Sequence, residues 1–278
     1  MSFDVSHPEI LDAVYRALAE DIGTGDVTTE LCVAEESQSL GRMIARHELV
    51  VAGVELVPLV FPYCGVEILH PSGSRVVPGT IIAEVQGKSR DLLTGERTAL
   101  NFVQRLSGIA TLAAAYVAET AGTKCKILDT RKTTPGLRRL EKQACAAGGV
   151  VNHRHGLYDG ILIKNNHITA AGGVRQALER TRDTHLRVEI EVRTLEELDE
   201  ALQCGAQHLL LDNLTPGEAH VWVQRVAGRA TTELSGGITL GSIKAYAASG
   251  ADFISVGALT HSSPAADLNF RLSAPYTG

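Results

Sequence analysis

Short apolar segments alternate with amphipathic ones along the second half of the chain, and this alternation limits the fold more than any other feature. The apolar segments cover residues 126–128, 160–163, 188–192, 208–211, 232–234 and 253–256. Thr194 with Glu197, and Thr215 with Pro216, mark the starts of helices between them. Strands that alternate with helices form parallel sheets, because each helix returns the chain to the same edge. The sequence therefore predicts a parallel α/β domain.

The number of strand–helix units indicates how this sheet closes. Six units are clear and the pattern allows a seventh, but Gly122 to Ser263 is shorter than the about 250 residues of a full eight-fold barrel. We therefore expect an incomplete α/β barrel. An open doubly wound sheet is the alternative, although no Gly-x-Gly-x-x-Gly motif follows any predicted strand.

The first part of the chain has a different pattern. Between Gly41 and Lys88, short β-rich runs are separated by turns at Pro71-Ser72-Gly73 and Pro78-Gly79. A long helix rich in Leu and Ala is predicted from Asp91 to Ala121, with Ser107-Gly108 as the place where it could break. A second, smaller domain is expected here.

Almost every strand predicted in the second part ends in polar residues. The carboxyl ends of the strands of an α/β barrel form one rim, where active sites lie. The series runs through 129–132, 164–167, Glu191, 212–213, 235–237 and 255–257. Because cations come first and carboxylates follow, we expect one site for a charged ligand at this rim.

Basic residues cluster in an otherwise acidic chain. Nine basic residues stand against three acidic ones between Lys124 and Lys164, whereas the whole chain has a net charge of -6. Arg131, Lys132 and Arg154 would share the rim with Lys164, and like charges this close repel each other. A small anionic substrate would relieve the repulsion. The acidic remainder lacks the broad basic face of nucleic-acid-binding proteins, so no nucleic-acid partner is expected.

Carboxylates and glycine turns complete the predicted rim. Glu191 and Asp212 could bind Mg²⁺ through water or pair with nearby cations, and Glu189 faces the same interior if its strand is regular. Backbone N–H groups of Ser235-Gly236-Gly237 and Ser255-Val256-Gly257 could hold phosphate, the first helped by a following helix N-terminus.

Several other side chains near the rim have weaker assignments. His153 neighbours Arg154 and could donate to a substrate or position it, whereas His155 and His167 are expected to be structural. Arg138, Arg139 and Lys142 are typical of the exposed face of a helix.

The cysteines and the hydropathy of the sequence indicate in which compartment the protein is expected. The five cysteines show neither metal-type spacing nor a disulfide framework, which indicates a reducing cytoplasm. The longest nearly apolar run, Leu49 to Phe61, contains Glu55 and is too short for a membrane span of about 20 residues. Met1 to Ile10 has no apolar core of a signal peptide. We expect a cytoplasmic protein without a membrane partner.

Ordered motifs over nearly the whole chain resemble those of quinolinate phosphoribosyltransferases, the decarboxylating enzymes of de novo NAD synthesis. The matching residues are Glu20 to Thr29, Glu96-Arg97, Leu106 to Thr111, Asp129 to Gly136, Asn152-His153-Arg154, Ile163 to Ile168, Leu211-Asp212-Asn213 and Ser235 to Ile238. Ordered matches of this length are far more specific than any one motif.

The resemblance implies a fold and an assembly. It implies an N-terminal α/β open sandwich over residues 1–110 and an incomplete, seven-stranded α/β barrel over 111–263, with a tail at 264–278 that packs on the first domain. It also implies a homodimer or hexamer, in which Arg97 is lent across the interface to the neighbouring subunit. By its own pattern Arg97 is an ordinary helix arginine.

The resemblance further implies the substrates and the residues that bind them. Quinolinate and phosphoribosyl pyrophosphate are the expected substrates, with Mg²⁺ as cofactor. Lys132, Glu191 and Asp212 are the expected catalytic residues, and the two carboxylates the expected metal ligands. The family's remaining contacts map to Thr130, Arg131, His153, Arg154, Lys164, Ser235, Gly236 and Gly257, to which the phosphate turns add Gly237, Ser255 and Val256.

Two departures from the family pattern lie before His153. Gln143 and Cys145 occur where many members have Tyr and Val, and Val150 occurs where a third glycine is common. Three rival functions stay open: a phosphoribosyltransferase for another base such as nicotinate, a non-catalytic sensor of sugar phosphates, and a sugar-phosphate isomerase or lyase barrel. The third would not explain the segment from Asp129 to Gly136.

Overall fold

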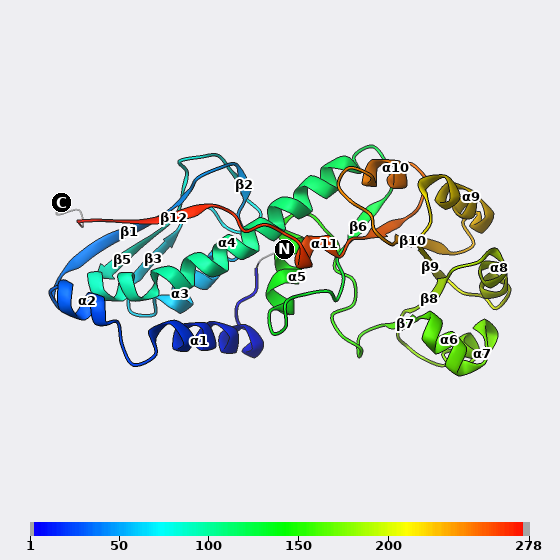
Figure 1. Ribbon diagram of the computed structural model, residues 1–278, viewed down its shortest axis with the longest axis horizontal. Helices are drawn as coiled ribbons and strands as arrows, with labels where there is room; N and C mark the ends of the chain where they lie inside the picture. The colour runs from blue at the N-terminus through cyan, green and yellow to red at the C-terminus, as the bar shows by residue number, and fades with distance from the viewer. Residues whose placement is uncertain (1–2, 275–278) are drawn as a thin grey trace. The chain divides into compact units, whose positions relative to one another are not determined.

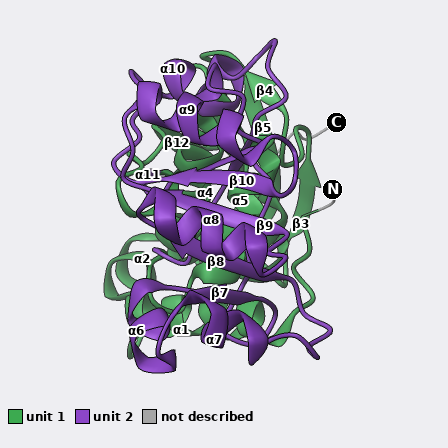
Figure 2. Ribbon diagram, turned by 90° about the vertical axis from the view of Figure 1, so that its right-hand side faces the viewer, with its two compact units in different colours: residues 1–114, 133–149, 259–278 green, residues 115–132, 150–258 purple. Residues whose placement is uncertain are grey.

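Figure 1 shows the computed structural model, which describes residues 3–274. The chain forms two compact units (Figure 2). Unit 1 comprises residues 1–114, 133–149 and 259–278, and unit 2 comprises residues 115–132 and 150–258. The chain thus leaves unit 2 after Lys132 and returns to it at Val150.

Unit 1 contains a four-stranded antiparallel sheet in the order β12-β1-β5-β3. Its strands are β1 (Gln38–Ala45), β3 (Gly65–Ile68), β5 (Ile81–Lys88) and β12 (Leu268–Ser273). The pair β2 (Leu49–Val50) and β4 (Arg75–Val76) forms a second, smaller sheet. The strand β12 comes from the far end of the chain and pairs with β1 from Leu268–Ala45 to Ser273–Leu40. The C-terminal segment is therefore an integral part of this sheet.

One long helix, α4 (Ser89–Glu119), runs without interruption past Ser107 and Gly108, where a break could have been expected. Ser107 Oγ accepts a hydrogen bond from Ala52 N–H (3.0 Å), so the serine is used across the fold. A Cβ at Gly108 would collide with the backbone of Pro264. This glycine marks a close approach of two backbones rather than a helix break.

Helix α5 (Arg138–Ala147) corrects one prediction. Lys142, assigned to an exposed face, is completely buried, while Arg138 and Arg139 are half-buried. The helix turns Glu141 and Lys142 inward because Arg105 of α4 forms an ion pair with Glu141 (2.8 Å). The remaining helices of unit 1 are α1 (Pro8–Ile22), α2 (Val27–Cys32), η1 (Val54–Leu56) and α3 (Val57–Val60).

Unit 2 is an α/β unit built on a six-stranded parallel sheet in the order β6-β11-β10-β9-β8-β7, as the alternating pattern predicted. The strands are β6 (Lys126–Leu128), β7 (Ile161–Ile163), β8 (Val188–Val192), β9 (His208–Asp212), β10 (Thr231–Ser235) and β11 (Phe253–Ser255). The helices are α6 (Asn165–Ala171), α7 (Val174–Glu179), α8 (Leu195–Gln203), α9 (Pro216–Val226) and α10 (Ile243–Ala247), and α11 (Ala258–His261) begins at the last residue of this unit and continues in unit 1.

Helices α8 and α9 pack on this sheet and begin where the sequence indicated (Figure 1). Thr215 and Glu218 form the reciprocal capping box of α9, with Pro216 at its first position. Thr194 caps α8, but Glu197 accepts its return hydrogen bond from Arg193 N–H. No helix among residues 3–274 is long and apolar enough to cross a membrane.

Candidate active site

The carboxyl ends of all six strands of unit 2 lie at one edge of the sheet, because every neighbouring pair is parallel. The polar residues that end or follow these strands therefore share that edge. They are 129–132 after β6, Lys164 after β7, Glu191 in β8, Asp212 in β9, Ser235 in β10 and Ser255 in β11.

A buried carboxylate holds the segment 152–154 next to the end of β6. Asp129 is 0% exposed. Its Oδ1 accepts a hydrogen bond from His153 N–H (2.8 Å), and its Oδ2 accepts one from Asn152 Nδ2 (2.6 Å). Val151 forms a parallel bridge with Leu128 in the same place. The segment that carries His153 and Arg154 is thus fixed from the sheet.

Two guanidinium groups of this edge repel each other. Arg154 is half-buried, and its Nη1 donates a hydrogen bond to Gly160 O (3.0 Å). Burial lowers the pKa of Arg154, and the charge of Arg131 lowers it further. An anion bound beside both side chains would remove this repulsion, which is the behaviour predicted for the basic cluster.

His153 faces two acidic side chains inside unit 2. Its Nε2 lies 3.1 Å from Glu189 Oε2 and 3.5 Å from Glu233 Oε2. Burial acts to lower the pKa of His153, but the hydrogen bonds and charges of the two carboxylates outweigh it and raise this pKa to about 9. Burial acts to raise the pKa of Glu189, but the hydrogen bond and charge of His153 outweigh burial, so this pKa is lowered. The pKa of Glu233 is raised, mainly by burial.

The two carboxylates predicted as metal ligands share a cation from their own chain. Arg193 Nη2 lies 2.8 Å from Glu191 Oε1, and Arg193 Nε lies 3.9 Å from Asp212 Oδ2. Pairing of these carboxylates with a nearby cation was the alternative to metal binding, and Arg193 forms that pair. The sequence pattern did not point to Arg193. The donor set fits Mg²⁺, which prefers oxygen ligands and keeps several waters, once the exposed Arg193 side chain moves aside.

The lysines of the edge extend into solvent. Lys132 and Lys164 are both exposed. Thr130 Oγ1 accepts a hydrogen bond from Lys132 N–H (3.1 Å), which fixes the backbone beneath that lysine. His167 Nδ1 accepts one from Lys164 N–H (2.9 Å), which gives His167 a capping contact at the start of α6. Long side chains on backbone fixed in this way can reach a bound anion.

The turn after β10 leaves no room for a side chain. Gly236 has φ +109° and Gly237 has φ +59°. A Cβ at Gly236 would lie 2.8 Å from Asn213 N, and Asn213 N–H donates to Ser235 O (2.9 Å). The expected help from a following helix is not present, because α10 begins only at Ile243 and has five residues. Any anion here would meet backbone N–H groups of the turn itself.

This close packing leads to a prediction for Gly236→Ala. The added Cβ must push Asn213 away and strain the backbone. We expect a loss of at least ~1 kcal/mol in the free energy of unfolding, measured by urea titration. Gly228→Ala is the matched control, since Gly228 also has positive φ but no heavy atom lies within 4 Å of the place its Cβ would take. Equal losses in both variants would show that packing against Asn213 contributes nothing.

Sequence reasoning missed three residues of this site. Asp129 was seen only as part of a motif, and Arg193 and Glu233 were not considered. Glu233 lies in the middle of β10 between Thr232 and Leu234, and Glu189 lies between two apolar residues of β8. Acids inside predicted core strands were the available signal. Arg97 is exposed on α4 in unit 1, so its expected role concerns a second copy of the chain.

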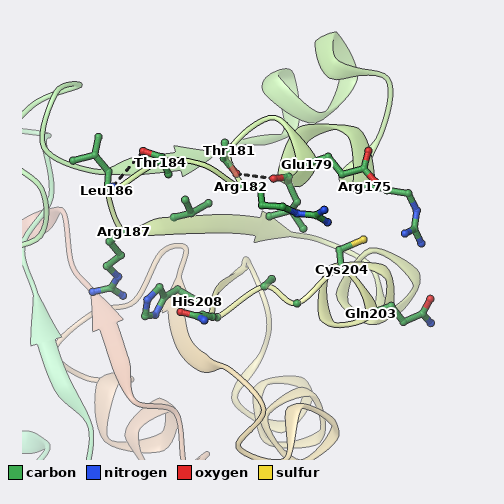
Figure 3. A pocket seen from close by; sticks show the side chains of 15 residues that line it. Arg175, Glu179, Thr181, Arg182, Thr184, Leu186, Arg187, Gln203, Cys204 and His208 are labelled. Carbon is green, nitrogen blue, oxygen red and sulfur yellow. Dashed lines mark hydrogen bonds between the residues drawn. The ribbon is translucent and has the colours of Figure 1, made fainter.

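A separate hollow of about 540 Å³ lies at the opposite ends of the strands, beside the starts of β8 and β9 (Figure 3). Arg175, Arg182 and Arg187 line it together with Glu179 and His208. In Figure 3, Arg187 and His208 lie at one side of the hollow and Arg175 at the other, so the arginines do not converge on one point.

Comparison with known proteins identifies the group that this chain resembles. The family model for the N-terminal domain of quinolinate phosphoribosyl transferase matches residues 26–107, and the model for the C-terminal domain matches residues 109–271. A nicotinate-nucleotide pyrophosphorylase [carboxylating] of Mycobacterium leprae is 44% identical over 273 residues, covering 94% of this chain and 96% of the relative. A probable enzyme of the same name from Bacillus subtilis is 40% identical over 276 residues, covering 97% and 95%.

A solved structure supports the same family. The nicotinate-nucleotide pyrophosphorylase of Francisella tularensis has a TM-score of 0.92 at 38% identity, covering 96% of this chain and 98% of that one.

Proposed function

Because the chain belongs to the quinolinate phosphoribosyltransferase family, we propose that it transfers the phosphoribosyl group of phosphoribosyl pyrophosphate to quinolinate. The products are nicotinate mononucleotide, pyrophosphate and CO₂. The main support for this proposal is the excess of positive charge at the carboxyl edge of the unit 2 sheet. There, half-buried Arg131 and Arg154 repel each other and exposed lysines flank them. A substrate with two carboxylates beside a ring nitrogen matches this excess of cations.

Each cation has a proposed part in binding quinolinate. Arg131 and Arg154 can form paired N–H contacts with a carboxylate, and Lys164 adds a point charge. Thr130 lies beside them and completes the proposed contacts, whereas His153 supports the segment that carries Arg154. Arg97 of a neighbouring subunit would supply a further guanidinium, which makes a homodimer or larger assembly part of this proposal.

Glu191, Asp212 and Lys132 are the proposed catalytic residues. As pyrophosphate leaves, the ribose carbon gains positive charge, and a fixed carboxylate such as Glu191 stabilises it. Glu191 and Asp212 would hold Mg²⁺, directly or through water. Bound Mg²⁺ neutralises charge on the pyrophosphate. Lys132 is exposed at the same edge and can contact the departing phosphates.

The turns after β10 and β11 are the proposed phosphate sites. Ser235-Gly236-Gly237 and Ser255-Val256-Gly257 end neighbouring parallel strands, so their backbone N–H groups lie at the same edge. Gly236 supports this assignment because it has no room for a side chain that would cover the turn. The two turns suit the 5-phosphate of the ribose.

The reaction balances without an organic cofactor. The ring nitrogen of quinolinate forms the bond to the ribose carbon as the bond to pyrophosphate breaks. The resulting pyridinium accepts the electron pair of the breaking carbon–carboxylate bond, and CO₂ leaves. The carbanion then takes one proton from water or an adjacent acid, which gives nicotinate mononucleotide. Orientation of the two substrates should supply much of the rate.

We also propose that unit 2 is a seven-stranded incomplete barrel. A single parallel bridge between Leu128 and Val151, next to β6 and at the edge opposite β7 in the strand order, supports this proposal. The meeting point of the two family matches, between residues 107 and 109, supports a domain boundary near residue 110. A second boundary near residue 263, with the tail at 264–278 on the first domain, and a cytoplasmic location remain parts of the proposal.

Ligand binding gives a test that needs no turnover. Quinolinate should raise the melting temperature, because a ligand at one hundred times its Kd stabilises the native state by about 2.7 kcal/mol. Phosphate and sulfate should do the same at higher concentration, and nicotinate, with one carboxylate, should do so less than quinolinate. Differential scanning fluorimetry measures all four. A melting temperature that no anion changes would contradict the proposed anion site.

A further inference from the structure

Two buried carboxylates remain unused by the proposed reaction. Glu189 lies on β8 and Glu233 on β10, the two strands that flank β9. Their exposed fractions are 3% and 1%. Burying a carboxylate costs free energy unless the group is paired. Two buried carboxylates close together therefore need a hydrogen-bond donor or a cation beside them.

The partner of both carboxylates is the imidazole of His153. Its Nε2 lies 3.1 Å from Glu189 and 3.5 Å from Glu233, whereas its Nδ1 accepts the N–H of Arg154 (2.7 Å). In the neutral ring, Nδ1 carries no hydrogen because it accepts the N–H of Arg154, so the ring hydrogen lies on Nε2 and is donated to Glu189 Oε2, with Glu233 Oε2 beside it. Both ring nitrogens are therefore engaged by the protein.

This arrangement also argues against a metal ion in the cluster. The ligand atoms of His153, Glu189 and Glu233 lie within 4.8 Å of one another, close enough for a shared cation. A metal at Nε2 of neutral imidazole would require the hydrogen on Nδ1. Arg154 N–H already points at Nδ1, so the two hydrogens would collide.

Other groups near the cluster are less well placed to occupy it. Arg187 Nη2 lies 3.8 Å from Glu189 Oε1, but its side chain is 45% exposed and its guanidinium stacks over Phe253 at 5.6 Å. The Oε1 atom of Glu189 has no hydrogen-bond partner among the described residues. His153 is thus the main polar contact of the two acids within the described chain.

We propose that Glu189 and Glu233 are positioning residues, which fix the ring of His153 and, through its Nδ1, the backbone of Arg154. This inference rests on the proposed function, in which Arg154 binds a carboxylate of quinolinate. Asp129 holds the same segment through His153 N–H and Asn152. The segment is thus held by carboxylates that follow or belong to three different strands, and the orientation of Arg154 depends on all three.

Steady-state kinetics of Glu189→Ala and Glu233→Ala test the proposal. Each should raise KM for quinolinate at least ~10-fold and leave KM for phosphoribosyl pyrophosphate within about 2-fold. Glu189→Gln should recover most of this loss, because an amide oxygen still accepts the Nε2 hydrogen. Asp252→Ala is the matched control, since Asp252 bonds Thr232 and Lys124 at the other end of the same sheet. Its KM for quinolinate should not change.

A double-mutant comparison separates positioning from general loss of structure. In a His153→Ala background, Glu189→Ala should change KM for quinolinate by less than about 2-fold, because its effect passes through the missing ring. If the effects of His153→Ala and Glu189→Ala on KM multiply in the double variant, or if KM rises equally for both substrates, the proposal is overturned.

A readout without catalysis distinguishes failure of this inference from failure of the proposed function. Histidine ring nitrogens labelled with ¹⁵N should show His153 as the Nε2–H tautomer at pH 10, where the ring is neutral, and as a mixture in Glu189→Ala. A wild-type Nδ1–H tautomer would overturn the proposal whatever the activity. The expected tautomer in a protein that makes no product would instead refute the proposed reaction alone.

Discussion

Replacement of Arg154 by alanine should lower kcat/KM for quinolinate at least ~10²-fold, equivalent to about 2.7 kcal/mol. The half-buried guanidinium is held by Gly160 O, and its neighbour Arg131 shares the same edge. Removing it takes away the proposed paired contact with a carboxylate of quinolinate and leaves a partly buried gap that water must fill. Initial rates of nicotinate mononucleotide formation at varied quinolinate measure the change.

Arg182→Ala is the control for this substitution. Arg182 lies in unit 2 as well, but it is in the hollow at the opposite ends of the strands (Figure 3). It should leave kcat/KM within about 2-fold of the wild type. Near-normal kinetics of Arg154→Ala, or an equal loss in both variants, would contradict the assignment of the quinolinate site to the carboxyl edge of the sheet.

Replacement of Glu141 by alanine should lower the free energy of unfolding by about 3 kcal/mol or more. Glu141 is 0% exposed and accepts hydrogen bonds from Arg105 Nη2 (2.8 Å), Thr134 N–H (3.0 Å) and Thr134 Oγ1 (2.7 Å). Its loss leaves the Arg105 guanidinium, which also donates to Ser263 O, without its carboxylate. Urea unfolding followed by circular dichroism measures the difference.

The exposed pair Arg139–Glu9 offers a matched control. Its atoms are 3.1 Å apart, a distance close to that of Arg105–Glu141, but Glu9 is 66% exposed. Glu9→Ala should cost less than about 1 kcal/mol, because water solvates the partner that remains. A loss in Glu141→Ala as small as that in Glu9→Ala would show that the buried network does not stabilise unit 1.

Alternation of strand and helix predicted unit 2 well because each of its strands is short, apolar and followed by a polar residue. The six predicted segments overlap β6 to β11 closely at both ends. Periodicity reports on neighbours within one segment, so it could not show that β12 returns from residues 268–273 to pair with β1. Pairing over that distance depends on tertiary packing, which no local pattern contains.

Charge was a weaker guide than strand pattern. Lys142 was expected in solvent because lysine is almost never fully buried, yet α5 buries it next to Glu141. Glu233 escaped notice because one acid in an apolar strand resembles an edge residue. For the two buried acids the partner lies far away in sequence, as Arg105 does for Glu141 and His153 does for Glu233.

The departures from the family pattern have local structural consequences. Gln143 exchanges two hydrogen bonds with the backbone of Asp4, at 2.6 and 2.9 Å, and so ties α5 to the start of the chain. Cys145 and Val150 are both buried. With these three residues in place, Asp129 still accepts its hydrogen bonds from Asn152 and His153.

Product analysis by mass spectrometry tests the central claim most directly. Purified protein is incubated with phosphoribosyl pyrophosphate and Mg²⁺ together with either quinolinate or nicotinate. Nicotinate mononucleotide and CO₂ from quinolinate, with no product from nicotinate, is the predicted result. Product from nicotinate alone would contradict the account and make the protein a non-decarboxylating transferase, and no product from either base would favour a sensor of sugar phosphates.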